Sequence, residues 1–323
     1  MSNIFEKRTH FKPFEYPQLL KYIDLMHKTF WVHDEINFTA DINDYLINLT
    51  PNEKESFRKS LISIAQIEIG VKLFWGKIYN HFPKPEINGL GATFAHNEWI
   101  HSQAYSNLLT VLGLEKDFLD IYNIPVLVKK QKFNDNKLSS PDIIDQLFYF
   151  TIGIENASLF SQFANILSFT RFKGLMKNTS NIIAWTSADE SNHAEAGIEL
   201  LNIVFKENPK RKEKYTQDYI INLLNEYIDI EIELLNWVYE DGELKFFTQE
   251  DIVNYMKYRL DNSIIKLGYE KVFNITNEQY KPMKWFDEEI YSNTLDDFFS
   301  KRPVDYTKHD KSFDIDDIFD DND

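Results

Sequence analysis

Two four-residue stretches, Glu98-Trp99-Ile100-His101 and Glu190-Ser191-Asn192-His193, repeat one pattern about ninety residues apart. In an α-helix, residues i and i+3 lie on the same face, so each stretch directs a carboxylate and an imidazole to one point. A single glutamate precedes each stretch, Glu68 before the first and Glu155 before the second. The order carboxylate, Glu-x-x-His, carboxylate, Glu-x-x-His is that of a ligand set for two metal ions inside a four-helix bundle.

Each candidate ligand lies within an apolar stripe of helical spacing. The stripe residues are Phe57, Leu61, Ile64, Val71, Trp75 and Ile78 near Glu68; Phe94, Tyr105, Leu108 and Leu112 near Glu98; Phe148, Ile152 and Leu159 near Glu155; and Ile183, Leu201 and Val204 near Glu190. A carboxylate on a core-facing stripe costs on the order of several kcal/mol if it is unpaired. Ordinary hydrogen bonds could satisfy one stripe but not all four, whereas a shared pair of cations satisfies them together. We therefore predict a dinuclear site with the metal ligands Glu68, Glu98, His101, Glu155, Glu190 and His193.

Length and composition predict one large helical domain. The chain has 323 residues, 43% of them hydrophobic and 15% aromatic, which suffices for a single large core. We predict an all-α fold over 1–300, a ferritin-like helical bundle with extra peripheral helices, followed by an acidic tail over 301–323.

The charge and the absence of cysteine restrict the possible functions. A net charge of −16 argues against nucleic acid or an anionic membrane surface as a partner. Without cysteine, the chain cannot form disulfides, zinc–thiolate sites or iron–sulfur clusters, and any thiol must come from a partner. No signal peptide is visible in 1–11, and charged residues interrupt the most apolar helix, 61–78. We expect a cytoplasmic protein.

Several sequence signals predict the helix boundaries. Thr50-Pro51-Asn52-Glu53 is a capping box that opens the Glu68 helix. Ser140-Pro141-Asp142 is expected to open the Glu155 helix in the same way. The stretch 113–140 is the longest connection between ligand helices and fits a crossover. Further helices are expected at about 215–239 and 249–270.

The residue types at the site favour oxidative chemistry. Carboxylate and imidazole ligands without sulfur suit iron or manganese, whereas zinc prefers fewer ligands with more nitrogen or sulfur. Asp189 directly precedes Glu190 and is placed to accept the second N–H of a ligand histidine.

Tyr105 and Lys72 each allow two interpretations. Tyr105 lies one turn after His101, where a phenol could lose an electron and a proton to an oxidising metal pair. On residue type alone, a core tyrosine with a hydrogen-bonded hydroxyl is the favoured interpretation. Lys72 lies one turn after Glu68, where it either pairs with a carboxylate, most simply that of Glu68, or points to solvent.

The C-terminal stretch 307–323 combines many aspartates with isolated phenylalanines and isoleucines. This composition suits a solvated disordered tail, and it equally suits a segment that orders when it docks on a partner.

The chain resembles the small, radical-generating subunit of class I ribonucleotide reductases over nearly its whole length. The matching pieces are Phe30-Trp31 with Glu35, Glu98-x-x-His101-x-x-x-Tyr105, Glu155 with Phe163, Asp189-Glu190-x-x-His193, and Asp297-Phe298-Phe299 to Tyr306 with the acidic tail.

The resemblance implies a division of labour between two subunits. The metal pair would hold a one-electron hole, which would pass to a catalytic cysteine in a separate large subunit that reduces ribonucleotides. By matching positions, Trp31, Asp189 and His101 would form the inner relay, and Tyr306 would carry the radical across the subunit boundary. The tail would dock on the large subunit, and the small subunit would be a homodimer.

The first ligand distinguishes subgroups of this family. Most members have Asp where Glu68 stands, and the manganese–iron subgroup that has Glu replaces the tyrosine by Phe. Glu68, Lys72 and a retained Tyr105 together resemble the dimanganese subgroup, class Id. There the manganese pair, formed with superoxide, is itself the oxidant and the tyrosine stays unoxidised. The alternative within the family is a Tyr105 radical with two irons or two manganese ions.

Other functions explain the pattern less completely. A dinuclear monooxygenase or oxidase of the same fold shares the six ligands, but does not account for Trp31, Tyr306 and the tail together. Ferritin-like storage proteins are usually near half this length. A scaffold with a vestigial site is disfavoured because all six ligands are intact.

Overall fold

A computed structural model of the chain describes residues 3–295, and all of its regular structure in that range is helical. The α-helices are α1 (Leu20–Lys28), α2 (Thr39–Asn43), α3 (Pro51–Lys77), α4 (Pro85–Leu112), α5 (Glu115–Leu119), α6 (Pro125–Leu138), α7 (Ile143–Tyr149), α8 (Phe160–Lys173), α9 (Lys177–Glu207), α10 (Pro209–Lys212), α11 (Gln217–Val238), α12 (Gln249–Lys266), α13 (Asn277–Tyr280) and α14 (Lys284–Leu295). Two π-helices, η2 (Asp44–Asn48) and η5 (Phe150–Ser158), and the short 3₁₀ turns η1 (Pro17–Leu19), η3 (Ile78–Asn80), η4 (Ile121–Asn123) and η6 (Lys281–Met283) complete the set. The predicted all-α class is confirmed. No helix within 3–295 has both the length and the apolar character needed to cross a membrane.

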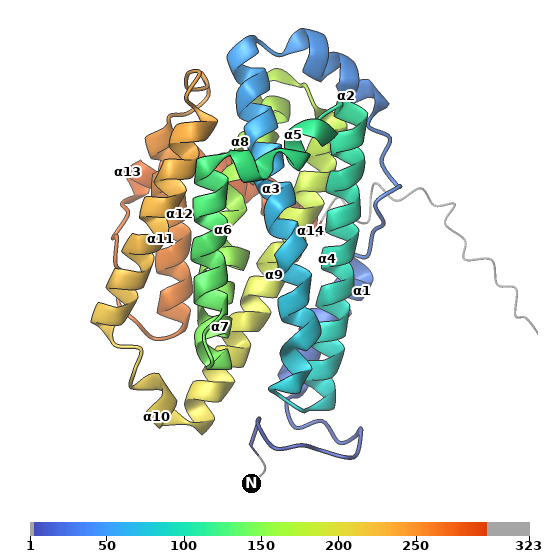
Figure 1. The fold of residues 1–323 in the computed structure, drawn as a ribbon. Coiled ribbons are helices and arrows are strands. Elements are labelled where there is room, and N and C mark those ends of the chain that lie inside the picture. Colours follow the sequence, from blue (N-terminus) through green and yellow to red (C-terminus); the bar gives the residue numbers. More distant parts are fainter. Residues whose placement is uncertain (1–2, 296–323) are drawn as a thin grey trace, which may run out of the picture.

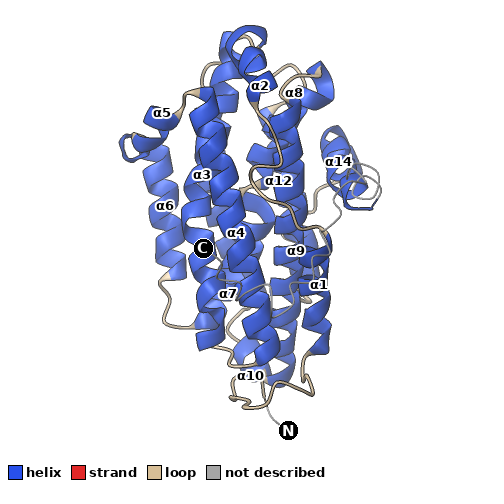
Figure 2. Cartoon of the chain, turned by 90° about the vertical axis from the view of Figure 1, so that its right-hand side faces the viewer, coloured by secondary structure: helices blue, strands red, loops and turns tan. Residues whose placement is uncertain are grey.

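Four long segments form the central bundle and carry the six predicted ligands. They are α3, α4, the continuous run α7–η5–α8, and α9, and they run side by side along the long axis of the molecule (Figures 1 and 2). α3 packs against α4 and α8, and α9 packs against α4, α8 and η5. The apolar stripes predicted from the sequence face this interior; Phe57, Phe94 and Phe148, for example, are fully buried. The fold is therefore the predicted ferritin-like bundle.

The two predicted helix starts differ in outcome. α3 begins at Pro51, and Glu53 accepts a hydrogen bond from the Thr50 backbone N–H at 2.8 Å, as the capping box predicted. The prediction that Ser140 opens the next ligand helix is wrong by two residues. α7 begins at Ile143, and its cap is Asp142, whose carboxylate accepts the Ile144 N–H at 3.0 Å. Ser140 instead donates to Asp145 at 2.9 Å.

The Glu155 segment is not a regular α-helix. Residues Phe150–Ser158 form a π-helix, and all nine are buried. The segment packs against α7, α8, α9, α11 and α12, so it has no solvent face. A π-helical segment inside an α-helix is uncommon and is frequently found at functional sites.

The peripheral helices lie beside the bundle and include the predicted crossover. Most of the stretch 113–140 is helical, with α5 and α6, and α6 packs on α11 and α7. Lys130 of α6 and Glu231 of α11 form a buried ion pair at 2.7 Å, which holds α6 in place. The helices predicted at 215–239 and 249–270 are confirmed as α11 and α12. Tyr306 and the tail predicted over 301–323 lie outside the described residues.

Candidate metal centre

The structure brings the six predicted ligands together in the bundle core. Two overlapping groups of side chains form there, and within each group the potential ligand atoms lie within 4.8 Å of one another. One group contains Glu68, Glu98, His101 and Glu190, and the other contains Glu98, Glu155, Glu190 and His193. Because Glu98 and Glu190 belong to both groups, they occupy the positions of carboxylates that could bridge two ions.

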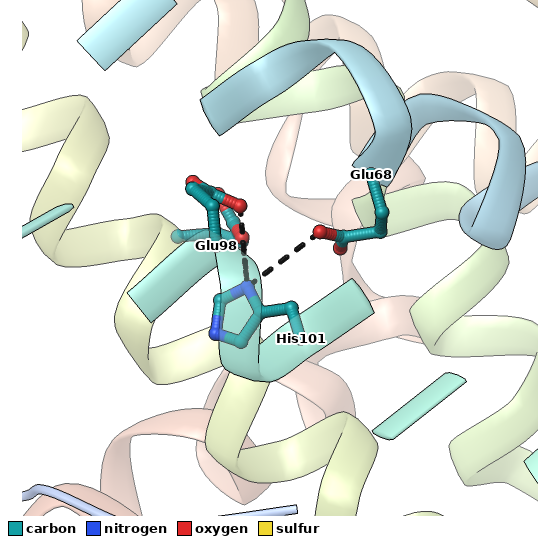
Figure 3. A group of neighbouring side chains, drawn as sticks. Glu68, Glu98 and His101 are labelled. Carbon is teal, nitrogen blue, oxygen red and sulfur yellow. Dashed lines mark ion pairs between the residues drawn. The ribbon is translucent and has the colours of Figure 1, made fainter. Parts of the chain in front are cut away.

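Each histidine faces the carboxylates with its Nδ1 atom. His101 Nδ1 lies 3.0 Å from Glu190 Oε1, 3.4 Å from Glu98 Oε2 and 3.8 Å from Glu68 Oε2. Figure 3 shows the Glu68 and Glu98 carboxylates directed at this ring from two different helices. His193 Nδ1 lies 2.9 Å from Glu98 Oε1, 3.4 Å from Glu155 Oε2 and 3.5 Å from Glu190 Oε2.

The donor set fits a pair of metal ions. All six side chains are essentially inaccessible to solvent. Seven of the eight carboxylate oxygens and both Nδ1 atoms have no hydrogen-bond partner. Unpartnered buried polar atoms are rare in proteins because each costs about 1–3 kcal/mol. Two cations, one in each group, would satisfy these unpartnered oxygen and nitrogen atoms together. Carboxylate and imidazole ligands suit iron or manganese.

The electrostatics of the cluster favour positive charge. Burial raises the pKa of Glu68 and Glu155, and neighbouring carboxylates raise it further. Burial alone would lower the pKa of His101 and His193, but contacts with the surrounding carboxylates outweigh it and raise both. Burial also opposes ionisation of Glu190, yet its close contacts with Glu155 and the two histidines hold its pKa below the usual range. The cluster thus takes up positive charge, from protons or from metal ions.

Trp31, Asp189 and His101 form one hydrogen-bonded chain. The Trp31 indole N–H donates to Asp189 Oδ2 at 2.8 Å, and His101 Nε2 lies 3.1 Å from the same oxygen. The Trp31 and His101 rings are also nearly parallel, with centroids 5.6 Å apart. Asp189 therefore contacts the histidine nitrogen that faces away from the carboxylate cluster, as expected for the residue that orients a metal-binding histidine.

Tyr105 is buried near the cluster. It lies one turn after His101 on α4. Burial and the nearby charge of Glu68 raise its pKa well above the usual value. Tyr105 is therefore in the core, and the Thr186 side chain interacts with its hydroxyl and opposes this rise in pKa.

Lys72 does not form the expected ion pair with the Glu68 carboxylate. Its ammonium donates to the Glu68 backbone carbonyl at 2.9 Å and to the Ser102 hydroxyl at 3.0 Å. The carboxylate of Glu68 is turned toward His101, so it is out of reach on the inner side of the helix. Lys72 and Ser102 line a surface cavity of about 360 Å³ between α3, α4 and α5.

Sequence reasoning missed two residues that contact this site. Asn97 donates to Asp189 Oδ2 at 3.0 Å, and Trp75 donates to Glu155 Oε1 at 2.7 Å. Asn97 immediately precedes Glu98 and lies three residues after Phe94 of the predicted stripe, so a polar side chain at this position is a signal that could have identified it. Trp75 continues the apolar stripe of α3, so the sequence predicts only a packing role for it.

The fold and the cluster define a class of protein: a ferritin-like helical bundle with carboxylates and histidines arranged for two metal ions. Within this class, the family model "Ribonucleotide reductase, small chain" matches residues 8–282. The chain belongs to this family, and it acts as the small subunit in a ribonucleoside-diphosphate reductase.

Relatives from viruses and bacteria match along most of their lengths. A probable ribonucleoside-diphosphate reductase small subunit of Invertebrate iridescent virus 3 is 25% identical, over 93% of this chain and 85% of the viral one. A ribonucleoside-diphosphate reductase subunit beta of Halalkalibacterium halodurans is 22% identical, over 88% and 84%. The structure of a dimanganese(II) NrdF of Streptococcus sanguinis superposes with a TM-score of 0.77 at 16% identity, over 88% of this chain and all of the other. At that identity the likeness concerns the fold.

Proposed function

We propose that this subunit stores one oxidising equivalent in a dimanganese centre, made with superoxide, and passes it to a catalytic cysteine of a large subunit for deoxyribonucleotide synthesis. The observation that carries the proposal is the hydrogen-bonded chain from His101 through Asp189 to Trp31. The bound metal pair would supply the one-electron oxidant. The ligands would be the six residues of the cluster, with Glu98 and Glu190 shared between the two ions.

The protein's own residues would keep charge balanced along the relay. When an electron leaves Trp31 toward the cluster, the indole N–H becomes more acidic, and Asp189 Oδ2 is placed 2.8 Å away to stabilise or accept that proton. Asn97 donates to the same oxygen and, with His101, keeps it oriented. Beyond Trp31 the relay would continue through Tyr306 to the partner subunit.

Two features support manganese with an unoxidised Tyr105. Oxidation of a phenol releases its proton, and the Thr186 hydroxyl that interacts with Tyr105 is not a base that could accept it. The Lys72 ammonium lines the cavity next to Ser102, whose hydroxyl bonds the Glu68 carbonyl, so a small anion such as superoxide would find a cation close to the Glu68 ligand. The alternative, a Tyr105 radical with two irons or two manganese ions, requires a proton acceptor for the phenol.

Electron paramagnetic resonance tests the choice between these two oxidants. After loading with Mn(II) and exposure to superoxide, we expect a coupled two-manganese signal without a tyrosyl radical. Tyr105→Phe should then keep most of the wild-type turnover with the large subunit, because the phenol takes no part. A tyrosyl radical signal, together with loss of turnover in Tyr105→Phe, would establish the alternative.

We also propose that the subunit is a homodimer formed through α3 and α4. These helices expose Ile69, Leu73 and Trp99, each more than half accessible in the single chain. Ile69 and Leu73 lie four residues apart on α3 and therefore share one face of that helix, and α3 packs along α4, which carries Trp99. A ribonucleotide reductase homodimer of Saccharomyces cerevisiae has the same fold, with a TM-score of 0.69 at 20% identity, over 88% of this chain and 90% of the other.

Replacing Leu73 by glutamate is expected to convert the dimer into monomers, because the contact would bury a charge against an apolar surface. Sedimentation velocity measures the change directly. Leu46→Glu is the matched control, since Leu46 is equally exposed on the distant η2. If Leu73→Glu still sediments as a dimer, this face is not the interface.

A further inference from the structure

Within residues 3–295, Trp75 makes the one hydrogen bond that reaches a ligand carboxylate oxygen. Its indole N–H donates to Glu155 Oε1 at 2.7 Å, and both side chains are fully buried. Trp75 lies on α3, two turns after Glu68, whereas Glu155 lies on the π-helix η5. The contact therefore joins one ligand to the helix that carries another.

This contact makes the four carboxylates unequal. Both oxygens of Glu68, Glu98 and Glu190 lack hydrogen-bond partners, but in Glu155 only Oε2 does. A carboxylate can bind a metal through one oxygen or through both. An oxygen that already accepts a short hydrogen bond in a dry interior is held in place, so the free Oε2 is the available donor. Oε2 is also the oxygen that faces His193 Nδ1.

The packing fixes the Trp75 ring in this position. Phe94 contacts it edge-on at 4.9 Å between centroids, and Phe150 does so at 5.7 Å. α4 approaches the Trp75 backbone closely at Gly91, where an added Cβ would lie 2.6 Å from the Trp75 carbonyl oxygen. A buried indole N–H usually has an acceptor. Turning the ring away from Glu155 would thus cost both the packing and the hydrogen bond.

We propose that Trp75 is a positioning residue that restricts Glu155 to binding through a single oxygen, and so makes the two metal positions inequivalent. The inference rests on the proposed dinuclear centre. The position next to Glu155 and His193 would receive one carboxylate oxygen from Glu155, whereas both oxygens of Glu68 are free at the other position. Removing the indole N–H would free Glu155 and alter chiefly the position beside it.

Trp75→Phe tests the proposal in the full-length protein, with Mn(II) binding followed by the signal of free Mn(II). We expect wild type to bind two ions per chain. In the variant, one of the two should bind about 10- to 100-fold more weakly, as is usual when a partner of a metal ligand is lost. The second ion should bind as in wild type. Trp285→Phe is the matched control, because Trp285 is buried but its indole N–H makes no hydrogen bond.

Infrared difference spectra between Mn(II)-loaded and metal-free protein provide a second readout. The separation of the two carboxylate stretching bands differs between one-oxygen and two-oxygen binding, and we expect it to change in Trp75→Phe but not in Trp285→Phe. Two ions bound with wild-type affinity and an unchanged band separation in Trp75→Phe would overturn the proposal. Failure of wild type to bind two ions would instead contradict the dinuclear centre itself.

A third measurement does not require the Trp75 variant to fold. The chain has six tryptophans, so ¹⁵N-tryptophan labelling gives six indole N–H resonances, which substitution of the other five assigns. On loading with diamagnetic Zn(II), the Trp75 resonance is expected to shift because Glu155 becomes a ligand, while that of Trp285 stays in place. A Trp75 resonance that does not respond to the metal would contradict its contact with a ligand.

Discussion

Trp31→Phe is expected to reduce nucleotide reduction with the large subunit to background while leaving the metal content at two ions per chain. Phenylalanine is far harder to oxidise than tryptophan, and it cannot donate the hydrogen bond that Trp31 makes to Asp189. The six ligands do not depend on that bond, since Asn97 and His101 still contact Asp189. Turnover assays, with metal analysis and paramagnetic resonance of the same samples, measure both properties.

Trp185→Phe serves as the matched control for this variant. Its ring lies 5.5 Å from that of Trp31, but Trp31 rather than Trp185 bonds Asp189. Tyr306→Phe should behave like Trp31→Phe if both belong to one relay, whereas deletion of 307–323 should instead weaken association with the large subunit. Normal turnover in either Trp31→Phe or Tyr306→Phe would refute the relay.

The metal cluster was predictable because its ligands obey helical periodicity. Glu98 and His101 lie three residues apart in α4, as do Glu190 and His193 in α9. Residues at this spacing lie on the same face of a regular helix, so the two side chains of each pair are close together. A carboxylate on an apolar stripe is itself a signal, because one lysine, Lys72, could pair with Glu68 but could not satisfy the carboxylates of the other three stripes. The six positions could therefore be identified without knowledge of how the helices pack.

The remaining features depend on contacts between distant segments. The backbone hydrogen bonds of the π-helix around Glu155 span five residues, compared with four in an α-helix. No residue preference in the sequence predicts this change. Lys72 bonds a backbone carbonyl, and sequence spacing alone cannot distinguish that acceptor from the carboxylate of the same residue. The contact of Trp75 with a ligand could not be predicted, because an aromatic residue on an apolar stripe is most often a packing residue. The hydrogen bond from Trp75 to Glu155 joins residues that lie 80 positions apart in the sequence.

Glu190→Ala is expected to weaken both metal positions at once. Glu190 belongs to both groups of the cluster, with Oε1 3.0 Å from His101 Nδ1 and Oε2 3.5 Å from His193 Nδ1. Loss of an outer-sphere partner already costs 10- to 100-fold in metal affinity, so loss of a shared ligand should cost at least about 100-fold, or about 2.8 kcal/mol, for each ion. Mn(II) titration should show no tight binding, and turnover should be lost.

Variants of ligands that belong to one group only show whether Glu190 is shared between the two ions. Glu68→Ala should affect chiefly the ion next to His101, because Glu68 belongs to one group only. Glu195→Ala is the control on the same helix, since Glu195 is partly exposed and pairs with Lys266 at the surface, where an ion pair contributes at most about 1 kcal/mol. Metal binding stabilises the folded state by mass action, so Mn(II) should raise the melting temperature of wild type and Glu195→Ala but not of Glu190→Ala. If Glu190→Ala retains one tightly bound ion, Glu190 belongs to a single metal position and the bridging assignment is wrong.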